Sequence, residues 1–316
     1  MRRRSARLRI TAVGAGAALA ALLSVGSASA DTTPQLAGDW APFSRCPVDD
    51  PAMLAADGSS DVAQCISSHS TSGTMKLGNT TVPTGNADLQ IGIISHNSGA
   101  PATLVAPSGG ALVADSADIP GGLLGLMCPS KVPVISSICD GITNSTLNRV
   151  TATMVSAGAP TNFSLPAGIG TGQPMMTIPV KIKLSNPFLA STCTIGTDSN
   201  PILLKPGNDS APSLAAQGFD GNGTPDSTIG SAMTRIAITG ADQSDSTFAV
   251  PGASNCGLLG AIDLAVDLKT GIPASSGTNK VVLNSASTYL GGLTAPGVAA
   301  PNDGSTLSQY WHSAVQ

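Results

Sequence analysis

Residues 176–184 read Met-Thr-Ile-Pro-Val-Lys-Ile-Lys-Leu, with apolar side chains at alternate positions and Lys181 and Lys183 between them. A period of two is typical of a β-strand that buries one face. Pro179 lies inside this run. Because proline has no backbone N–H to donate, we expect the segment to be an edge strand or to contain a bulge.

Residues 87–95 alternate in the same way. Leu89, Ile91 and Ile93 are separated by Asp88, Gln90 and Gly92, which predicts a second half-buried strand. Shorter strand signals recur at residues 74–77, 103–105, 111–114, 149–155, 232–239, 247–250 and 280–283. The chain from 31 to about 73 is rich in proline and turn residues, and we expect it to be irregular apart from one turn at 51–56.

Two segments have a helical period instead. Residues 258–268 place Asp263 and Asp267 on one face, and Gly271 then ends the pattern. Residues 132–142 predict a second, shorter helix. The sequence therefore predicts a mainly β fold, an antiparallel β-sandwich or barrel-like domain with one or two short helices, stabilised by disulfides.

The composition supports turns and strands. All 19 acidic residues are Asp, and the chain contains 36 Gly and 23 Pro. Glu favours helices, whereas Asp, Gly and Pro favour turns. Hydrophobic residues make up 41% of the 316 positions and charged residues only 11%, so a sizeable core is available and a disordered chain is disfavoured.

The first 30 residues have the three parts of an export signal. Arginines at residues 2–9 precede an apolar stretch at 10–25, and Ala28-Ser-Ala30 is an A-x-A cleavage site. The apolar stretch is shorter than the ~20 residues that a membrane-spanning helix needs. We expect a signal peptide at 1–30, by either the general or the twin-arginine route. The mature protein would then be secreted, extracellular or cell-surface associated, without a transmembrane segment.

Cleavage changes the charge and the organisation of the chain. Five of 15 basic residues lie in the signal, so the mature formal charge is 10 − 19 = −9. No lysine or arginine cluster remains, which disfavours nucleic acid and anionic membranes as partners. No long linker divides residues 31–316, and we expect a single β-rich extracellular domain. The alternative is two β-sandwich modules, at about 31–165 and 166–316.

Six cysteines lie in the mature part: Cys46, Cys65, Cys128, Cys139, Cys193 and Cys256. In an exported chain they predict three disulfides, for which six cysteines allow fifteen connectivities. We favour sequential pairing, because the first two pairs each enclose a short loop that can close locally, and Cys193 then remains for Cys256. A metal or redox site is disfavoured, since there is no C-x-x-C and no zinc spacing.

No motif assigns a catalytic mechanism. The chain has three histidines, and His96 beside Asn97-Ser98-Gly99 is the one Ser–His arrangement that we weigh, with a polar turn after a strand as its simpler interpretation. There is no G-x-S-x-G, P-loop or dinucleotide motif. Aromatic residues, at 3%, are too few for a sugar-binding platform. We therefore predict no enzyme, no catalytic residues and no organic cofactor.

One loop has the oxygen pattern of a calcium site. Asp220, Asn222, Thr224 and Asp226 occupy alternate positions, with glycines that permit tight turning. The bidentate Glu of such loops is absent, because Ser231 stands at position twelve. The same residue types are also usual in turns. A structural calcium ion is the only metal that the sequence suggests.

Four segments carry a resemblance to a known family. They are Lys181-Ile-Lys-Leu-Ser-Asn-Pro-Phe-Leu-Ala-Ser-Thr-Cys193-Thr-Ile-Gly196, Asn200-Pro-Ile-Leu-Leu204, Ser246-Thr-Phe-Ala-Val-Pro-Gly-Ala-Ser-Asn-Cys256-Gly and Gly271-Ile-Pro-Ala-Ser-Ser-Gly-Thr-Asn-Lys280. They resemble a family of exported actinobacterial proteins without established activity, mainly over residues 175–290. The resemblance implies export and supports a bond between Cys193 and Cys256. It implies no catalytic or binding residue.

These observations favour a non-enzymatic secreted or cell-surface protein with a structural or binding role. Its partner would be a cell-wall or cell-surface component, or a small apolar ligand, and the sequence does not identify it. The first alternative is an extracellular carrier of a small apolar ligand, because strands rich in Ile, Leu, Met and Val can line a dry cavity. The second alternative is a secreted hydrolase.

Overall fold

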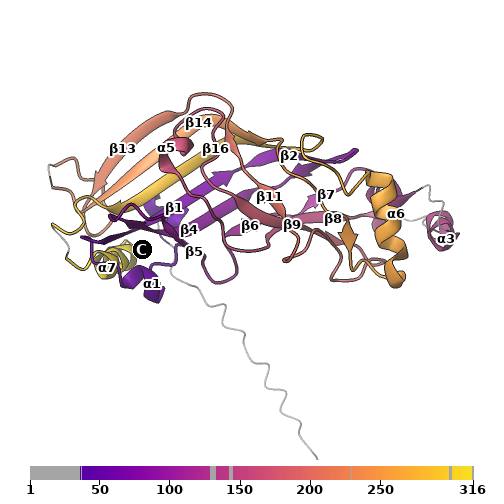
Figure 1. The fold of residues 1–316 in the computed structure, drawn as a ribbon, viewed down its shortest axis with the longest axis horizontal. Coiled ribbons are helices and arrows are strands. Elements are labelled where there is room, and N and C mark those ends of the chain that lie inside the picture. The colour runs from indigo at the N-terminus through magenta and orange to yellow at the C-terminus, as the bar shows by residue number, and fades with distance from the viewer. Residues whose placement is uncertain are drawn as a thin grey trace, which may run out of the picture. The chain divides into compact units, whose positions relative to one another are not determined.

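Two antiparallel β-sheets make up most of the structure, which is a computed structural model (Figure 1). It describes Leu36 and residues 38–128, 133–141, 145–228, 230–298 and 301–314. These belong to one unit of the chain, Pro34–Gln316. The expected signal peptide, residues 1–30, lies outside the described residues. The mainly β, antiparallel, sandwich-like fold with few short helices is confirmed.

The larger sheet has ten strands, and its main path runs β12-β14-β16-β1-β4-β5. These strands are β12 (Gly207–Asn208), β14 (Met233–Asp245), β16 (Lys280–Leu293), β1 (Asp61–Ser70), β4 (Ala87–His96) and β5 (Thr103–Val105). Four more attach to this path: β13 (Ser213–Phe219), β2 (Ser72–Leu77), β3 (Thr80–Thr84) and β6 (Leu112–Ala114). The central strand β1 pairs with β16 on one side and with β4 on the other.

The smaller sheet has six strands in the order β15-β10-β9-β8-β7, and β11 also pairs with β9. They are β15 (Ala253–Ser254), β10 (Thr194–Ile195), β9 (Ile178–Ser185), β8 (Thr151–Ser156), β7 (Ala117–Asp118) and β11 (Ile202–Leu204). In both sheets, strands from either side of residue 165 pair with each other, as β1 does with β16 and β8 with β9.

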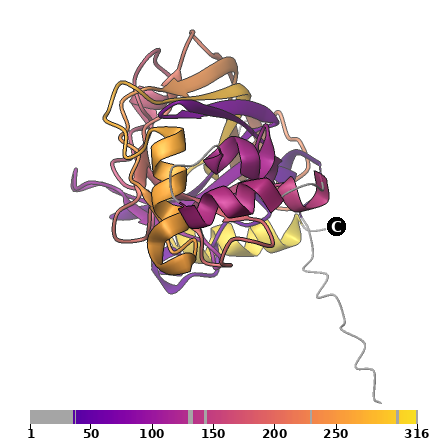
Figure 2. The same cartoon turned by 90° about the vertical axis from the view of Figure 1, so that its right-hand side faces the viewer.

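The helices are short. They are η1 (Gly38–Phe43), α1 (Pro51–Leu54), α2 (Gly122–Met127), α3 (Pro133–Gly141), α4 (Ser145–Asn148), α5 (Leu165–Gly168), η2 (Leu258–Gly260), α6 (Ala261–Thr270) and α7 (Asp303–Ser313). Figure 2 shows α6 beside the segment that contains α2 and α3. The helices expected at 258–268 and 132–142 correspond to η2–α6 and α3.

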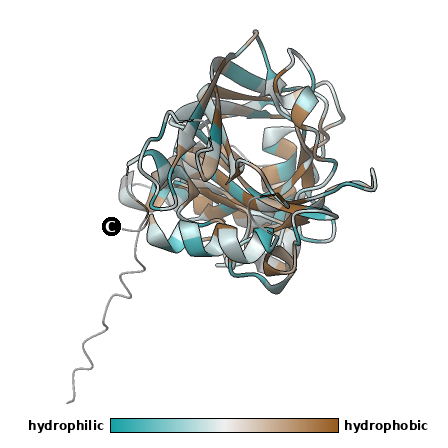
Figure 3. Ribbon diagram, turned by 90° about the vertical axis from the view of Figure 1, so that its left-hand side faces the viewer, coloured by the Kyte–Doolittle hydropathy of each residue, from teal (hydrophilic) through white to brown (hydrophobic). Residues whose placement is uncertain are grey.

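The main hydrophobic core lies between the sheets. In β9 the alternate residues Ile178, Val180, Ile182 and Leu184 are buried, as the period of two predicts. They belong to one cluster with apolar residues of β1 and β4, such as Ile66. Figure 3 shows hydrophobic residues, in brown, in strands of both sheets. Burial of these faces is the main favourable contribution to folding.

Strand β4 differs from the half-buried strand that the alternation predicted, because both of its faces are covered. Gln90 is only 2% exposed, and its Oε1 accepts a hydrogen bond of 2.7 Å from the backbone N–H of Arg45. Gly92 lies against Met53, whose sulfur would be 2.6 Å from an added Cβ. The segment before β1 therefore packs on the second face of β4, where Gly92 leaves room for Met53 and Gln90 binds the backbone of Arg45.

This second face has its own core, rich in aromatic side chains. Trp40 contacts Phe43 and Phe219 with ring centroids 5.3 and 5.2 Å apart. The guanidinium of Arg235 lies 5.4 Å from the Phe219 ring centroid and 5.3 Å from that of Tyr289. It also forms an ion pair of 2.9 Å with Asp39. Cation–π contact and ion pairing together hold η1 against β13, β14 and β16.

Several elements of the structure are not predicted by the sequence patterns. Strand β1 lies in the region expected to be irregular, and neither β13 nor α7 was predicted. Residues 247–250 form no strand, only an isolated bridge between Val250 and Ala274. The missed β1 carries His69, Ser67, Ser68 and Ser70 rather than a clean apolar alternation. Its neighbours on both sides, and not its own pattern, make it a strand.

The expectation that Pro179 marks an edge strand or a bulge is wrong. Strand β9 is flanked by β8 on one side and by β10 and β11 on the other. The carbonyl of Pro179 accepts a 2.9 Å hydrogen bond from the N–H of Ala157, immediately after β8 ends at Ser156. In an antiparallel pair the N–H of residue 179 would donate to the carbonyl of Ala157, but proline has no N–H. The second hydrogen bond of the pair is therefore missing, and the pairing with β8 ends there.

A buried carboxylate connects the C-terminal helix to β1. Asp303, the first residue of α7, is 0% exposed. Its Oδ2 accepts a 2.6 Å hydrogen bond from the N–H of Ala63. Burial raises the pKa of Asp303 to about 6, the nearby charge of Asp57 acts in the same direction, and the Ala63 hydrogen bond opposes them. The folded protein therefore holds a proton on Asp303 more tightly than the unfolded chain does.

This raised pKa predicts a pH dependence of stability. Between about pH 4 and pH 6 the folded state binds the extra proton, so the free energy of unfolding should fall as the pH rises through this window, by up to about 3 kcal/mol. Asp303→Asn keeps an acceptor for the Ala63 N–H and cannot ionise. We expect its melting temperature to exceed that of the unmodified protein at pH 7.5 and to approach it at pH 4. Parallel curves of melting temperature against pH would contradict this assignment.

Candidate functional site

An apolar cavity of about 50 Å³ lies between the two sheets. Ala87, Leu89 and Leu112 line it from the ten-stranded sheet. Met154, Ile178 and Leu204 line it from the six-stranded sheet. Each side chain points inward because of the alternation within its strand, and the cavity forms where facing side chains do not fill the space between the sheets.

Polar side chains reach this cavity from β1 and β14. Ser68, His69, Ser70 and Gln243 belong to its lining. Ser68 Oγ pairs with Thr288 Oγ1 at 2.8 Å, and Gln243 Nε2 donates to Asn208 Oδ1 at 3.2 Å. Ser70 is 3% exposed, and its Oγ has no hydrogen-bond partner among the described residues. The cavity therefore combines apolar walls with one free buried hydroxyl.

No sequence motif marks Ser70, His69 or Gln243 as residues of a site. Serines and threonines occur throughout the chain, and β1 itself was not recognised as a strand. Only the antiparallel register of β1 with β4, in which Ser70 faces Ala87, brings the hydroxyl to the space between the sheets. No local pattern in the sequence reports that arrangement.

His96 lies at the end of β4, bonded to two neighbouring strands. Its Nδ1 is 2.6 Å from Asp61 Oδ1 in β1, and its Nε2 is 2.9 Å from Thr103 Oγ1 in β5. The adjacent Ser98 Oγ instead accepts from the N–H of Ala100 at 3.4 Å. The hydroxyl–imidazole–carboxylate order is that of a hydrolase triad. Thr103, however, is an exposed residue of a three-residue strand and does not lie at the sharp turn that presents a nucleophile.

The other two histidines are separate from His96. His69 lines the cavity between the sheets. His312, in α7, has its Nε2 3.0 Å from both carboxylate oxygens of Asp49, and Ser308 Oγ donates to the same residue at 2.6 Å. Partial burial is the largest single influence on the pKa of Asp49 and raises it. The hydrogen bonds from Ser308 and His312, together with the charge of His312, outweigh that effect, so the net pKa of Asp49 is lowered. This cluster attaches α7 to the segment before α1.

The candidate calcium residues form a turn between β13 and β14. Asp220 Oδ1 accepts from the N–H groups of Asn222 and Thr224 at 2.8 and 2.9 Å. Asp226 Oδ1 accepts from the N–H of Thr228 at 2.9 Å. These are the side-chain-to-backbone bonds by which Asp closes a turn. Among the described residues, no group of three or more His, Cys or Asp side chains is placed to hold a metal ion.

The structure contains the sequential disulfides, Cys46–Cys65, Cys128–Cys139 and Cys193–Cys256. The first joins the segment after η1 to β1, and the second joins the end of α2 to α3. The third is fully buried and joins a residue next to β10 to a residue next to β15. These two cysteines are 63 positions apart in the sequence. The first bond thus attaches a loop to a strand and the third connects residues next to strands, whereas the second connects two short helices.

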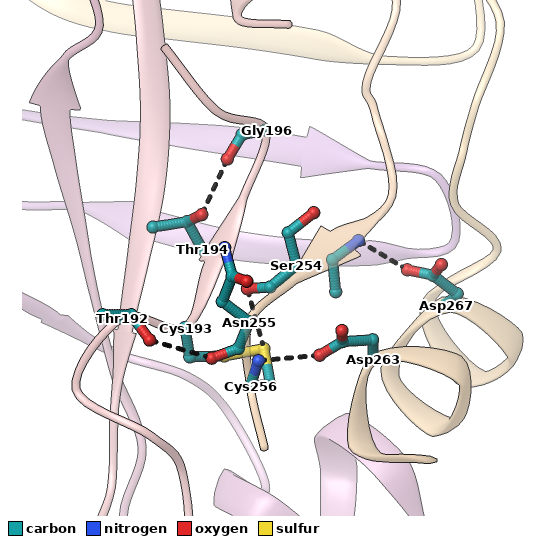
Figure 4. The surroundings of a disulfide bond; sticks show 10 residues. Thr192, Cys193, Thr194, Gly196, Ser254, Asn255, Cys256, Asp263 and Asp267 are labelled. Carbon is teal, nitrogen blue, oxygen red and sulfur yellow. Dashed lines mark hydrogen bonds between the residues drawn. A yellow bond between two sulfur atoms is a disulfide. The ribbon is translucent and has the colours of Figure 1, made fainter. Parts of the chain in front are cut away.

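Two carboxylates of α6 hold the segment that carries Cys256 (Figure 4). Asp263 Oδ1 accepts from the N–H of Cys256, and Asp267 Oδ1 accepts from the N–H of Ala253, both at 2.7 Å. Burial raises the pKa of Asp267, with a smaller contribution from the charge of Asp263. The one-face placement of these two residues was predicted from the sequence, and their role is to satisfy backbone donors beside the disulfide.

Comparison with protein-family models, with curated proteins and with solved structures found no match. The resemblance to exported actinobacterial proteins therefore stays a prediction from the sequence. In the part of the chain that the structure describes, no helix is long and apolar enough to cross a membrane. The cavity between the sheets is the arrangement with the clearest chemical character, and we take it as the candidate binding site.

The lengths of chain that the disulfides enclose predict their relative contributions to stability. Replacing Cys193 and Cys256 by alanine should lower the free energy of unfolding by about 4 kcal/mol, because the bond spans 63 residues. Replacing Cys128 and Cys139, which are 11 residues apart, should cost about 3 kcal/mol. Urea unfolding of both double variants measures the two losses. The reverse order would show that strain or local packing, and not chain entropy, dominates.

Proposed function

We propose that the protein is a non-enzymatic extracellular protein, secreted or associated with the cell surface, that serves as a structural or binding module. The observation that carries this proposal is the scaffold, a β-sandwich whose strands, loops and helices are crosslinked by three disulfides. Such crosslinks persist in oxidising compartments outside the cytoplasm. The export signal expected at residues 1–30 supports the same location.

The polar groups also support a non-enzymatic role. Asp220, Asp226, Asp263 and Asp267 accept hydrogen bonds from backbone N–H groups. An enzyme uses carboxylates to orient a base or to exchange protons with a substrate. These four carboxylates stabilise turns and segment ends instead.

Retention on isolated cell walls tests the cell-surface role. We expect the oxidised protein to bind wall fragments of the producing cells and to remain bound through washes at moderate salt, because a mature charge of −9 makes simple attraction to anionic polymers unfavourable. The reduced and alkylated protein, of nearly the same composition but without the scaffold, is the matched control. Equal retention of both forms, or no retention of either, would contradict a folded cell-surface module.

A second candidate function is favoured by the cavity between the sheets. Its apolar walls and its position inside the sandwich suit an extracellular carrier of a small apolar ligand. Apolar cavities that exclude water bind apolar molecules of matching size. In this proposal the disulfides keep the two sheets in place while the cavity is occupied.

Native mass spectrometry of the protein purified from its own secretion tests the carrier. We expect a fraction of the molecules to show a discrete excess mass above the chain with three disulfides, and this excess to disappear on denaturation. A mass equal to the mature chain minus six hydrogens in every preparation, with the protein kept folded throughout, would remove the carrier proposal.

A further inference from the structure

The free hydroxyl of Ser70 is the feature of the cavity that points to a ligand. Ser70 is the last residue of β1, it lines the cavity, and it is 3% exposed. Its Oγ has no hydrogen-bond partner among the described residues. A buried hydroxyl without a partner costs free energy, and a ligand oxygen placed in the cavity would remove that cost.

The walls of the cavity specify the charge of such a ligand. Of the described residues that line it, none is Lys, Arg or Asp, and His69 is the only titratable one. Leu89, Met154 and Val281 also line the cavity, and these apolar side chains offer no compensation for a charge on a ligand. Moving an ionised group from water into these surroundings is strongly unfavourable. The site therefore selects a neutral molecule.

The volume limits the size of the ligand. A cavity of about 50 Å³ is smaller than the about 150 Å³ that accommodates benzene in an engineered apolar cavity. It therefore holds only the narrow end of an aliphatic ligand, and not a whole molecule of the size of benzene or 1-butanol. Met154 is one of its walls, and the flexible side chain of methionine adapts to a linear aliphatic group.

We propose that the cavity between the sheets binds the oxygen-bearing end of a small, neutral, aliphatic molecule, of the alcohol or carbonyl class, through the hydroxyl of Ser70. This inference rests on the carrier function proposed above and names its ligand class. The Ser70 hydroxyl donates to the ligand oxygen, and the carbon atoms next to that oxygen contact Leu89, Met154 and Ile178.

Three probes of similar length separate hydrogen bonding, apolar contact and charge. They are 1-butanol, 1-chlorobutane and butyrate, titrated into the disulfide-bonded protein labelled with ¹³C at the methionine methyl groups. Met154 reports on the cavity, whereas Met53, in the second core, is the internal reference. We expect 1-butanol to shift the Met154 signal saturably without moving Met53, and butyrate to leave both unchanged at the same concentration.

Two serine variants test the role of the hydroxyl. Ser70→Ala should weaken 1-butanol binding about fivefold and leave 1-chlorobutane within about twofold, because only the alcohol loses a hydrogen bond. Ser67→Ala is the matched control, since Ser67 lies on the same strand, is 0% exposed and also has an unpartnered Oγ among the described residues, but does not line the cavity. It should leave the affinity for both probes unchanged.

A third variant tests the location. Ala87→Val adds volume to a wall of the cavity, and it should abolish the Met154 shift with 1-butanol and with 1-chlorobutane while the protein stays folded by circular dichroism. If 1-butanol still binds Ala87→Val as it binds the unmodified protein, the ligand lies elsewhere and the inference is overturned.

The remaining outcomes distinguish this inference from the carrier function. If both neutral probes bind but Ser70→Ala affects them equally, the assignment of the hydroxyl is wrong and the carrier proposal stands. If butyrate binds as tightly as 1-butanol, the neutral ligand class is wrong. If none of the three probes shifts Met154, the carrier proposal and this inference both fail.

Discussion

The antiparallel pairing of β1 with β16 and β4 is the interaction on which the other features depend. It joins an early strand to the last strand of the chain and to β4, and long-range pairing of this kind excludes alternative registers because a one-residue slip exchanges the two faces. Along β1, Cys65 bonds to Cys46, the N–H of Ala63 binds Asp303, and Ser70 reaches the cavity. A single strand thus fixes a disulfide, the C-terminal helix and the candidate site.

Burial of both faces of β1 and β4 explains why the protein has two cores. The first core lies between the sheets, and the second, rich in aromatic residues, lies under η1, α1 and α7. On the second face of β4, Gly92 leaves room for Met53, and the side chain of Gln90 accepts a hydrogen bond from the N–H of Arg45. The disulfide Cys46–Cys65 holds the segment that contains η1 and α1 in position against β1.

The candidate site follows from the same arrangement. Two sheets of different strand number meet with imperfect filling, and the residual space is lined by apolar side chains with the Ser70 hydroxyl exposed to it. In contrast, Asp220 and Asp226, which the sequence suggests as calcium ligands, accept hydrogen bonds from backbone N–H groups in a turn. These two carboxylates thus stabilise the chain locally, and the ligand role that we propose rests on the cavity between the sheets.

The mainly β class, strand β9 and helix α6 could be predicted from local patterns of residues, and the number of cysteines and the lengths of their loops favoured the sequential disulfides. These features depend on residues that lie close together in the chain. That β1 is a strand, that Pro179 lies in an interior strand and that Ser70 and Asp303 are buried could be seen only in the folded structure. Burial and strand pairing depend on neighbours contributed by distant segments, which no local pattern of residues records.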